Sequence, residues 1–386
     1  MIETKAAVLT GTATPPYATN PVVHIEDVQL TPPGSGEVLV RIAAAGLCHS
    51  DLSVINGDRP RPLPMVLGHE AAGVVEETGP GVSDVQPGDH VVFSFVPSCG
   101  ACVPCQSGRP ALCEPGARAN THGELLTGSK PFHRAGGERL NHHLGVSAFA
   151  ERTVVSAASL IRIPSHIPLE KAALFGCAVL TGVGAVINTA RPTPGTAVAV
   201  FGLGGVGLSA VMGAHLAGCH PVIAVDPLDA KLELATSLGA THAVKAGDDA
   251  PDVIRDITGG GAHCTVEAVG SARVLTAAYN ATRRGGQTVS AGLPHPDQRA
   301  ELPAALLVGE ERQVTGSYMG SAVPRRDIPR LLALHEAGRL PVDALHTQTL
   351  GLAEINTGFD ALAAGAAVRQ LVTPGTLPSG GANGEA

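Results

Sequence analysis

The sequence predicts an α/β protein that combines an irregular β-rich region with a doubly wound parallel sheet. Short β-branched runs separated by Gly and Pro occupy roughly the first 178 of the 386 residues. Strand-like runs then alternate with helix-like runs, and a glycine-rich turn follows the first of these strands. We therefore expect two domains, one formed by residues 1–178 and 322–386 and the other by residues 179–321.

The β-rich region contains several short segments with strand composition, and tight turns join them. The clearest predicted strands are 38–42, 72–76, 90–93 and 152–155. After about residue 322 the pattern predicts helices at 329–337 and 352–363, a strand at 370–373 and a frayed tail at 374–386.

The middle region alternates regularly between strand and helix. Residues 197–201 form a continuous apolar run, which is followed by a Gly turn and an Ala-rich helix. The further predicted elements are strands at 222–225, 265–269 and 287–291 and a helix over 228–238 that Gly239 terminates. Alternation of this kind is typical of a parallel sheet with crossover helices.

Charge and composition exclude several classes of partner. The chain has 26 Lys and Arg against 34 Asp and Glu, a net charge of −8, so it lacks the basic footprint of a protein that binds nucleic acid or an anionic membrane. No apolar stretch near the N-terminus resembles a secretory signal, and the weakly charged run 196–217 holds five glycines. We expect a cytoplasmic protein.

Four of the eight cysteines crowd into fifteen residues with the spacing C-x2-C-x2-C-x7-C. The pattern consists of Cys99, Cys102, Cys105 and Cys113. Four thiolates complete a closed tetrahedron around zinc, which indicates a structural site in a lobe at about 95–115. An iron–sulfur cluster and unliganded thiols are the alternatives. Cys219 and Cys264 lie outside this pattern, and we expect them to be ordinary buried thiols.

A second set of metal-ligand residues is spread along the chain. Cys48 precedes His49, Ser50 and Asp51, His69 lies in a Gly-His-Glu element with Glu70, and Cys177 stands in a Gly-Cys-Ala segment. One imidazole and two thiolates make a zinc site with an open fourth position. Each of these residues alone has an ordinary structural explanation, but their combination favours a catalytic metal centre.

A dinucleotide-binding fingerprint lies between a predicted strand and a predicted helix. It reads G-x-G-x-x-G and comprises Gly202, Gly204, Gly205, Val206 and Gly207. Asp226 ends the next predicted strand nineteen residues after Gly207, where it matches the acid that binds the ribose hydroxyls of NAD. This carboxylate would repel the 2′-phosphate of NADP, so the pattern favours NAD.

Taken in order, these motifs resemble the zinc-containing medium-chain alcohol dehydrogenases from about residue 5 to 373, closest to the long-loop branch of liver-type and glutathione-dependent formaldehyde dehydrogenases. The resemblance implies a GroES-like catalytic domain with an inserted Rossmann domain. It also implies two zinc ions per chain, with Cys48, His69 and Cys177 as catalytic ligands and Asp51 and Glu70 behind them. Zinc would lower the pKa of an alcohol, and hydride would pass to NAD.

The same resemblance assigns further residues and a homodimer. It places Ser50 at the start of a proton relay, with Ser53 where many relatives have a relay His. His49, Thr181, Lys231 and Arg369 would contact the cofactor, and Phe95, Leu144, Leu293 and Tyr318 would line the pocket, with His143 where liver-type enzymes have a bulky apolar residue. The substrate would be a primary aliphatic or aromatic alcohol.

Two other functions remain open at this stage. One is a dehydrogenase of thiol adducts of formaldehyde, although the segment 56–64 is shorter than in such relatives and Asp58 matches their substrate-binding acid only approximately. The other is a catalytically silent protein that binds NAD and zinc. Zinc content together with NADH formation on a panel of alcohols separates the three.

Overall fold

The computed structural model describes residues 1–375, which pack as two compact units. Unit 1 comprises residues 1–97 and 115–173 and the chain from Thr347 onward, and unit 2 comprises residues 98–114 and 174–346. The expected domain boundaries at 178/179 and 321/322 stay a prediction about functional domains. The cysteine-rich segment belongs to unit 2 by its packing, and most of the expected tail, residues 376–386, lies outside the described residues.

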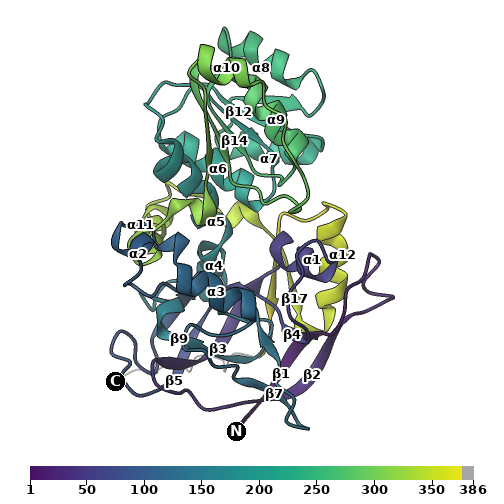
Figure 1. Cartoon of the computed structure of the whole chain (residues 1–386), viewed down its shortest axis with the longest axis vertical. Helices are drawn as coiled ribbons and strands as arrows, with labels where there is room; N and C mark the ends of the chain where they lie inside the picture. The colour runs from purple at the N-terminus through teal and green to yellow at the C-terminus, as the bar shows by residue number, and fades with distance from the viewer. Residues whose placement is uncertain (376–386) are drawn as a thin grey trace, which may run out of the picture. The chain divides into compact units, whose positions relative to one another are not determined.

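Unit 1 contains two mostly antiparallel sheets (Figure 1). Their strand orders are β7-β2-β1-β4-β8 and β10-β6-β5-β3-β18-β17, and β9 pairs with β3 beside the second path. The strands are β1 (Ile2–Leu9), β2 (Val23–Leu30), β3 (Glu37–Gly46), β4 (Met65–Val66), β5 (Glu70–Thr78), β6 (His90–Phe93), β7 (Phe132–Arg134), β8 (Asn141–His142), β9 (Arg152–Ser156), β10 (Leu160–Ile163), β17 (His346–Gly351) and β18 (Arg369–Thr373).

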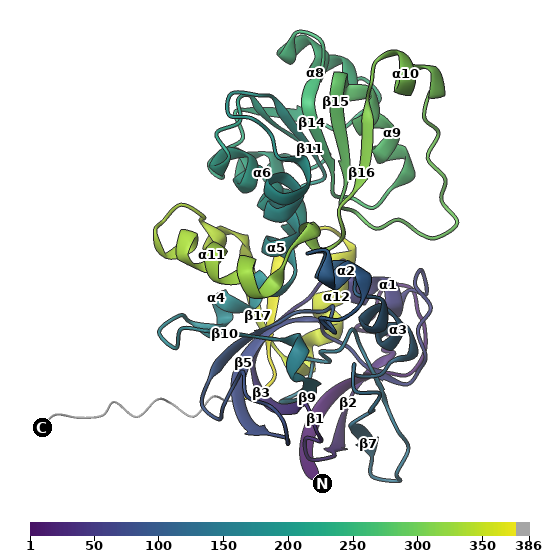
Figure 2. The same ribbon diagram turned by 60° about the vertical axis from the view of Figure 1, so that its left-hand side comes forward.

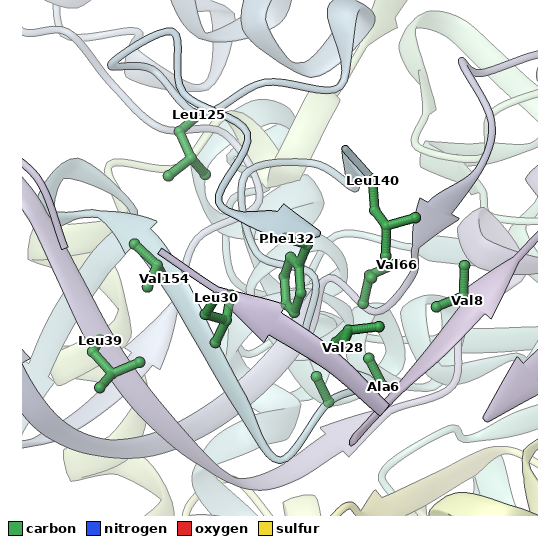
Figure 3. Packing of buried hydrophobic residues seen from close by; sticks show 11 residues of the cluster. Ala6, Val8, Val28, Leu30, Leu39, Val66, Leu125, Phe132, Leu140 and Val154 are labelled. Atoms are coloured by element: carbon green, nitrogen blue, oxygen red, sulfur yellow. The ribbon is translucent and has the colours of Figure 1, made fainter. Parts of the chain in front are cut away.

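The core of unit 1 is built from β-branched and aliphatic side chains, since the chain has no Trp and only seven Phe. Phe132 lies fully buried among Val and Leu side chains from β1, β2 and β4 (Figure 3). The helices of this unit are α1 (His49–Ile55), α3 (Glu114–His122), α4 (Leu169–Ala173) and α12 (Ile355–Ala363).

The pairing of β3 with β5 brings two sequence motifs together. β3 ends at Gly46, and Cys48 then occupies the N-cap position of α1. β5 begins at Glu70, directly after Gly68 and His69. Because the two strands are antiparallel neighbours with Gly46 opposite Glu70, the end of one motif lies beside the start of the other.

Unit 2 contains a six-stranded sheet in the order β13-β12-β11-β14-β15-β16, and every pairing in it is parallel. This order confirms the predicted doubly wound sheet. The strands are added on one side of β11 up to β13 and then on its other side from β14, so the strand order reverses between β11 and β14. Figure 2 shows β16 at the edge of the sheet. The strands are β11 (Val198–Phe201), β12 (Val222–Asp226), β13 (His242–Lys245), β14 (Ala262–Glu267), β15 (Thr282–Ser290) and β16 (Gln313–Gly316).

Helices α6 (Gly205–Leu216), α7 (Asp229–Ser237), α8 (Ala250–Thr258), α9 (Ala272–Ala281) and α10 (Ala304–Gly309) connect the strands of this sheet, and several of them contact it directly. The other helices of unit 2 are α2 (Val103–Gln106), α5 (Ala178–Gly184) and α11 (Pro324–Glu336). Short turns complete the two units: η1 (Pro110–Leu112), η2 (Ala157–Ser159), η3 (Leu174–Gly176), π-helical η4 (Ala185–Ala190), η5 (Tyr318–Ser321), η6 (Val342–Leu345) and η7 (Leu352–Glu354).

Several predicted elements begin or end at the wrong residue, among them three in the second half of the chain. The strand expected at 265–269 is β14, which ends at Glu267 because that buried carboxylate accepts the backbone N–H groups of Val269 and Gly270. The strand expected at 287–291 is the longer β15 and ends at Ser290. The helix expected from Pro329 is α11, which begins at Pro324 and keeps Pro329 inside it.

Among residues 1–375 no single helix is long and apolar enough to cross a membrane. Only the bent pair Leu169–Gly176 and Ala178–Ala190 reaches that length and composition, and it does so jointly across a 49° bend.

Candidate functional site

Cys48, Asp51 and His69 form a buried polar group in unit 1. Cys48 caps α1 and Asp51 lies in its first turn, so one helix end positions both side chains. Asp51 Oδ1 accepts the backbone N–H of Gly68 at 3.1 Å and lies 3.1 Å from His69 Nδ1. With Nδ1 donating to the carboxylate, His69 keeps the lone pair of Nε2 for another partner. This arrangement orients an imidazole as a metal ligand.

Burial and charge act on His69 in opposite directions. Burial disfavours the imidazolium form, but the adjacent Asp51 carboxylate and Cys48 together raise the pKa of His69 well above its usual value. Cys48, Asp51 and His69 are at most 6% exposed. A thiol and an oriented imidazole in such a place fit the donor set that zinc prefers.

Glu70 begins β5 and Arg369 begins β18, and both side chains lie close to this buried group. Glu70 is fully buried, and Arg369 is 3% exposed with its Nε 3.5 Å from Glu70 Oε1. Arg369 Nη2 also lies 3.9 Å from Cys48 Sγ. The guanidinium thus lies against the thiol and the carboxylate in unit 1, and the pyrophosphate contact expected for it stays a prediction.

Ser50 and Phe95 lie against the same group. Ser50 is half-buried, with Oγ 4.0 Å from Cys48 Sγ, while His49 is exposed. Ser53 donates its hydroxyl to the carbonyl of His49 at 2.8 Å. Phe95 is 7% exposed and packs edge-on against the His69 ring, with ring centroids 5.5 Å apart.

The four clustered cysteines lie together in unit 2. Their sulfur atoms are all within 4.8 Å of one another. Backbone N–H groups also point at the sulfurs, from Cys102 to Cys99 Sγ at 3.3 Å and from Cys99 to Cys113 Sγ at 3.2 Å. Hydrogen bonds from Ala101 and Cys102 lower the pKa of the Cys99 thiol to about 7, whereas burial raises that of Cys105 to about 12. Four converging thiols fit a closed zinc site.

The glycine-rich turn connects β11 to α6, as the fingerprint predicts. Gly202 has φ +87°, a conformation that disfavours residues with a side chain. A Cβ on Gly207 would overlap the carbonyl group of Gly202, whereas a Cβ on Gly204 would meet nothing within 4 Å. The helix therefore packs tightly on the turn, and open space lies next to its first N–H groups. Such a place accepts a phosphate group.

Asp226 ends β12 and lies beside this turn, 4% exposed. Its carboxylate accepts the N–H of Leu203 at 2.8 Å and that of Leu228 at 3.0 Å, so both oxygens are held in place by the backbone. Lys231 is half-buried on α7. In α5 the hydroxyl of Thr181 is buried and has no hydrogen-bond partner among the described residues. An orphaned buried hydroxyl of this kind fits a site that a ligand completes.

The other predicted residues are divided between the two units. Cys177 is buried at the N-cap of α5 in unit 2. Leu144 is 7% exposed in unit 1, whereas Leu293 and Tyr318 of unit 2 are 54% and 40% exposed. A shared pocket and a three-ligand metal site that join these residues stay predictions.

Sequence reasoning missed the roles of two residues. Glu267, 1% exposed, ends β14 and accepts the N–H groups of the Val269–Gly270 loop, and burial raises its pKa. An acid at the end of an apolar strand was the available signal. His143 lies 3.4 Å from Asp51 although 92 positions separate the two residues, so no local pattern reveals this contact.

Comparisons with known proteins agree with this geometry. Residues 34–165 match the family model of the alcohol dehydrogenase GroES-like domain, and residues 205–337 match that of the zinc-binding dehydrogenases. The chain is 40% identical over 375 residues to an NDMA-dependent alcohol dehydrogenase of Amycolatopsis methanolica, covering 96% of this chain and 99% of the relative. It is 38% identical over 356 residues to an S-(hydroxymethyl)glutathione dehydrogenase of Synechocystis, covering 91% and 96%.

A solved structure agrees with both domains. The benzyl alcohol dehydrogenase of Acinetobacter calcoaceticus superimposes with a TM-score of 0.90 at 31% identity, covering 97% of this chain and 100% of that chain. These matches confirm the GroES-like and Rossmann fold classes and the resemblance found in the motifs. The chain belongs to the zinc-dependent medium-chain alcohol dehydrogenases and is a zinc-dependent alcohol oxidoreductase.

Proposed function

We propose that this enzyme uses NAD to interconvert a primary aliphatic or aromatic alcohol and its aldehyde. The alcohol loses a hydride to the nicotinamide ring and a proton to solvent, so electrons and atoms balance. The observation that carries NAD dependence is the buried Asp226 carboxylate, which the N–H groups of Leu203 and Leu228 hold beside the glycine-rich turn.

Two zinc ions per chain are part of the proposal. Cys48, His69 and Cys177 would hold the catalytic ion, and the four-cysteine group of unit 2 would hold the structural one. At the catalytic site zinc supplies a Lewis acid that lowers the pKa of the alcohol. Asp51 fixes the tautomer of His69, and Ser50 is the hydroxyl group that accepts the alcohol proton at the start of its path to solvent.

Three features of unit 2 support a bound dinucleotide. The open space at Gly204 suits a pyrophosphate, Asp226 suits the ribose hydroxyls, and the orphaned hydroxyl of Thr181 suits the nicotinamide end. We retain Lys231, His49 and Arg369 as cofactor contacts. The Amycolatopsis relative is named for NDMA, so the electron acceptor is the point that most needs a test.

Side chains near His69 support the proposed substrate class. Phe95 and Leu144 are apolar and buried, and with Leu293 and Tyr318 they would make a pocket for an apolar alcohol. The name of the Acinetobacter structure favours aromatic alcohols within this class. A thiol adduct of formaldehyde is the second candidate, and it is supported by the name of the Synechocystis relative. Asp58, the acid expected to mark such enzymes, is exposed and accepts a hydrogen bond from Asn56 at 2.7 Å.

The test is a panel of alcohols offered with NAD, NADP or NDMA as acceptor, combined with metal analysis. We expect two zinc ions per chain and NADH formation with primary aromatic and aliphatic alcohols. Turnover with NDMA and none with free NAD would contradict NAD as a dissociable acceptor. Oxidation of formaldehyde only in the presence of glutathione or another thiol would select the second candidate.

We also propose a homodimer in a reducing cytoplasm. The edge strand β16 and helix α10 expose apolar side chains, including Val314 at 38% and Val308 at 79%. An open edge strand of this kind pairs readily with a second copy. Sedimentation of the wild type and of Val314→Lys tests this, since a charge on the edge strand should shift the dimer toward monomer.

A further inference from the structure

A second imidazole, that of His143, lies beside the carboxylate that orients His69. His143 Nε2 is 3.4 Å from Asp51 Oδ1, the same oxygen that lies 3.1 Å from His69 Nδ1. The two imidazole rings are edge to face, with centroids 5.7 Å apart. All three side chains are at most 2% exposed, so solvent does not compete for these contacts.

The backbone around His143 is held in an unusual conformation. Leu144, Gly145 and Ser147 have φ values of 50°, 65° and 49°. Residues with side chains adopt this left-handed region only where the surrounding structure enforces it, which is common at functional sites. The enforcing contacts are present: His143 donates its backbone N–H to Ser147 Oγ at 2.8 Å, and that hydroxyl donates to the carbonyl of Val66 at 2.8 Å. The turn thus fixes where the His143 ring lies.

The His143 ring has the Asp51 carboxylate within hydrogen-bonding distance. Neither nitrogen of His143 has a well-aligned hydrogen bond among the described residues. A neutral imidazole offers one N–H donor, and Asp51 Oδ1 is an acceptor 3.4 Å from Nε2. Hydrogen bonds at catalytic centres are often long without ligands and tighten when the site fills.

We propose that His143 is a positioning residue for the catalytic metal centre. It donates Nε2–H to Asp51 and holds that carboxylate against His69, so that Nε2 of His69 stays directed at the zinc. This inference rests on the proposed zinc site. It adds His143 to the groups that determine how tightly the metal is held, apart from any contact with substrate.

The same three residues do not form a metal site of their own in this proposal. Their ligand atoms lie within 4.8 Å of one another. However, His69 Nδ1 donates to Asp51 and has no lone pair to offer on that side while Nε2 binds zinc. A third metal ion per chain would therefore contradict the proposal.

The experiment measures zinc binding in the full chain by competition with a chelator. The variants are His143→Phe, which keeps a ring but removes the donor, and His143→Gln, which keeps a donor. Cys48→Ser identifies the phase of zinc release that belongs to the catalytic site, and the four-cysteine site is the internal reference. We expect His143→Phe to weaken catalytic zinc binding about tenfold, with the reference site unchanged. His143→Gln should stay within about twofold of wild type.

A double-mutant cycle with Asp51→Asn separates positioning from packing. If His143 acts through Asp51, His143→Phe has little further effect on zinc binding in the Asp51→Asn background. Equal losses in His143→Phe and His143→Gln, additive losses in the cycle, or unchanged zinc binding in His143→Phe would overturn the proposal. Failure of the wild type to hold a second zinc would instead contradict the proposed function. Should His143→Phe not fold, His143→Leu, which also lacks a hydrogen-bond donor, takes its place in the comparison with His143→Gln and in the cycle with Asp51→Asn.

Discussion

Glu70 fills the space that a side chain at Gly46 would need. The two residues face each other across the β3–β5 pair, and a Cβ on Gly46 would lie only 2.9 Å from Glu70 Cδ. Glu70 is fully buried and lies 3.5 Å from Arg369 Nε, so its carboxyl group has little freedom to move elsewhere. A glycine on one strand thus determines where the buried Glu70 carboxylate lies on the next.

Gly46→Ala is expected to displace the Glu70 carboxylate from its place beside Arg369. We expect kcat/KM for an alcohol to fall about tenfold, the size of effect seen when groups behind a metal ligand are disturbed. Steady-state kinetics with thermal unfolding measure this. Gly11→Ala is the matched control, because a Cβ on Gly11 meets nothing within 4 Å. Wild-type kinetics in Gly46→Ala would mean that the position of Glu70 is unimportant for turnover.

Asp226→Ser is expected to reverse the discrimination between NAD and NADP. The carboxylate would meet a 2′-phosphate as a like charge at a buried position, and such a contact costs several kcal/mol. The ratio of kcat/KM for the two cofactors should move by about a hundredfold toward NADP. Asp229→Asn removes a charge from the exposed, Lys245-paired position nearby and should leave the ratio unchanged. A constant ratio in both variants would show that Asp226 does not face the ribose.

Cys102→Ser is expected mainly to destabilise the fold, whereas Cys48→Ser is expected mainly to abolish turnover. Loss of a structural zinc ligand removes folding free energy directly, so Cys102→Ser should lower the free energy of unfolding by about 3–5 kcal/mol. Cys48→Ser should abolish turnover with a smaller loss of stability. Denaturant unfolding, zinc content and activity of each variant measure this, with Cys219→Ser as the control because Cys219 is buried outside both thiol groups. One zinc per active, folded wild-type chain would refute the two-site assignment.

His142 makes the folded chain sensitive to acid. Burial lowers the pKa of His142 to about 3, and its Nε2 lies 3.1 Å from the carbonyl of Val154. Below about pH 6.5 His142 becomes protonated in the unfolded chain, whereas in the folded chain it stays neutral down to about pH 3. Protonation of His142 therefore does not reduce the free energy of unfolding above pH 6.5. As the pH falls below 6.5 the free energy of unfolding decreases, by about 2 kcal/mol at pH 5.

The measurement is the free energy of unfolding of wild type and His142→Gln at pH 7, 6 and 5. The difference between the two proteins cancels acid effects that they share, such as those of the other buried imidazoles and the metal ligands. Wild type should lose about 2 kcal/mol more than the variant between pH 7 and pH 5. Parallel losses in both proteins would mean that His142 takes up its proton in the folded state as readily as in the unfolded one.

Local patterns in the sequence were enough wherever the interacting residues are close along the chain. The four cysteines converge because all lie within fifteen residues, and the glycine-rich turn lies between β11 and α6 because strand, turn and helix are consecutive. Family resemblance added the role expected of Cys48, His69 and Cys177 as zinc ligands and the GroES-like class of the first domain. The predicted end of β14 was wrong because apolar periodicity does not reveal the hydrogen bonds that Glu267 accepts. The predicted start of α11 was wrong because the position of Pro329 does not reveal that the helix begins at Pro324.

Tertiary structure decided the contacts that cross the sheets and turns of each unit. The Gly46–Glu70 pair depends on the register of two antiparallel strands, and a shift by one residue would turn Glu70 to the other face. The His143–Asp51 contact depends on a turn in which Leu144 and Ser147 have left-handed backbone conformations. The sequence does not predict this turn, because Leu and Ser rarely adopt that conformation. Sequence by itself determined the types of ligand and their local spacing. Only the folded backbone determined that His143 lies beside Asp51 and that Glu70 packs against Gly46, because register and enforced φ angles bring residues that are distant in the chain together.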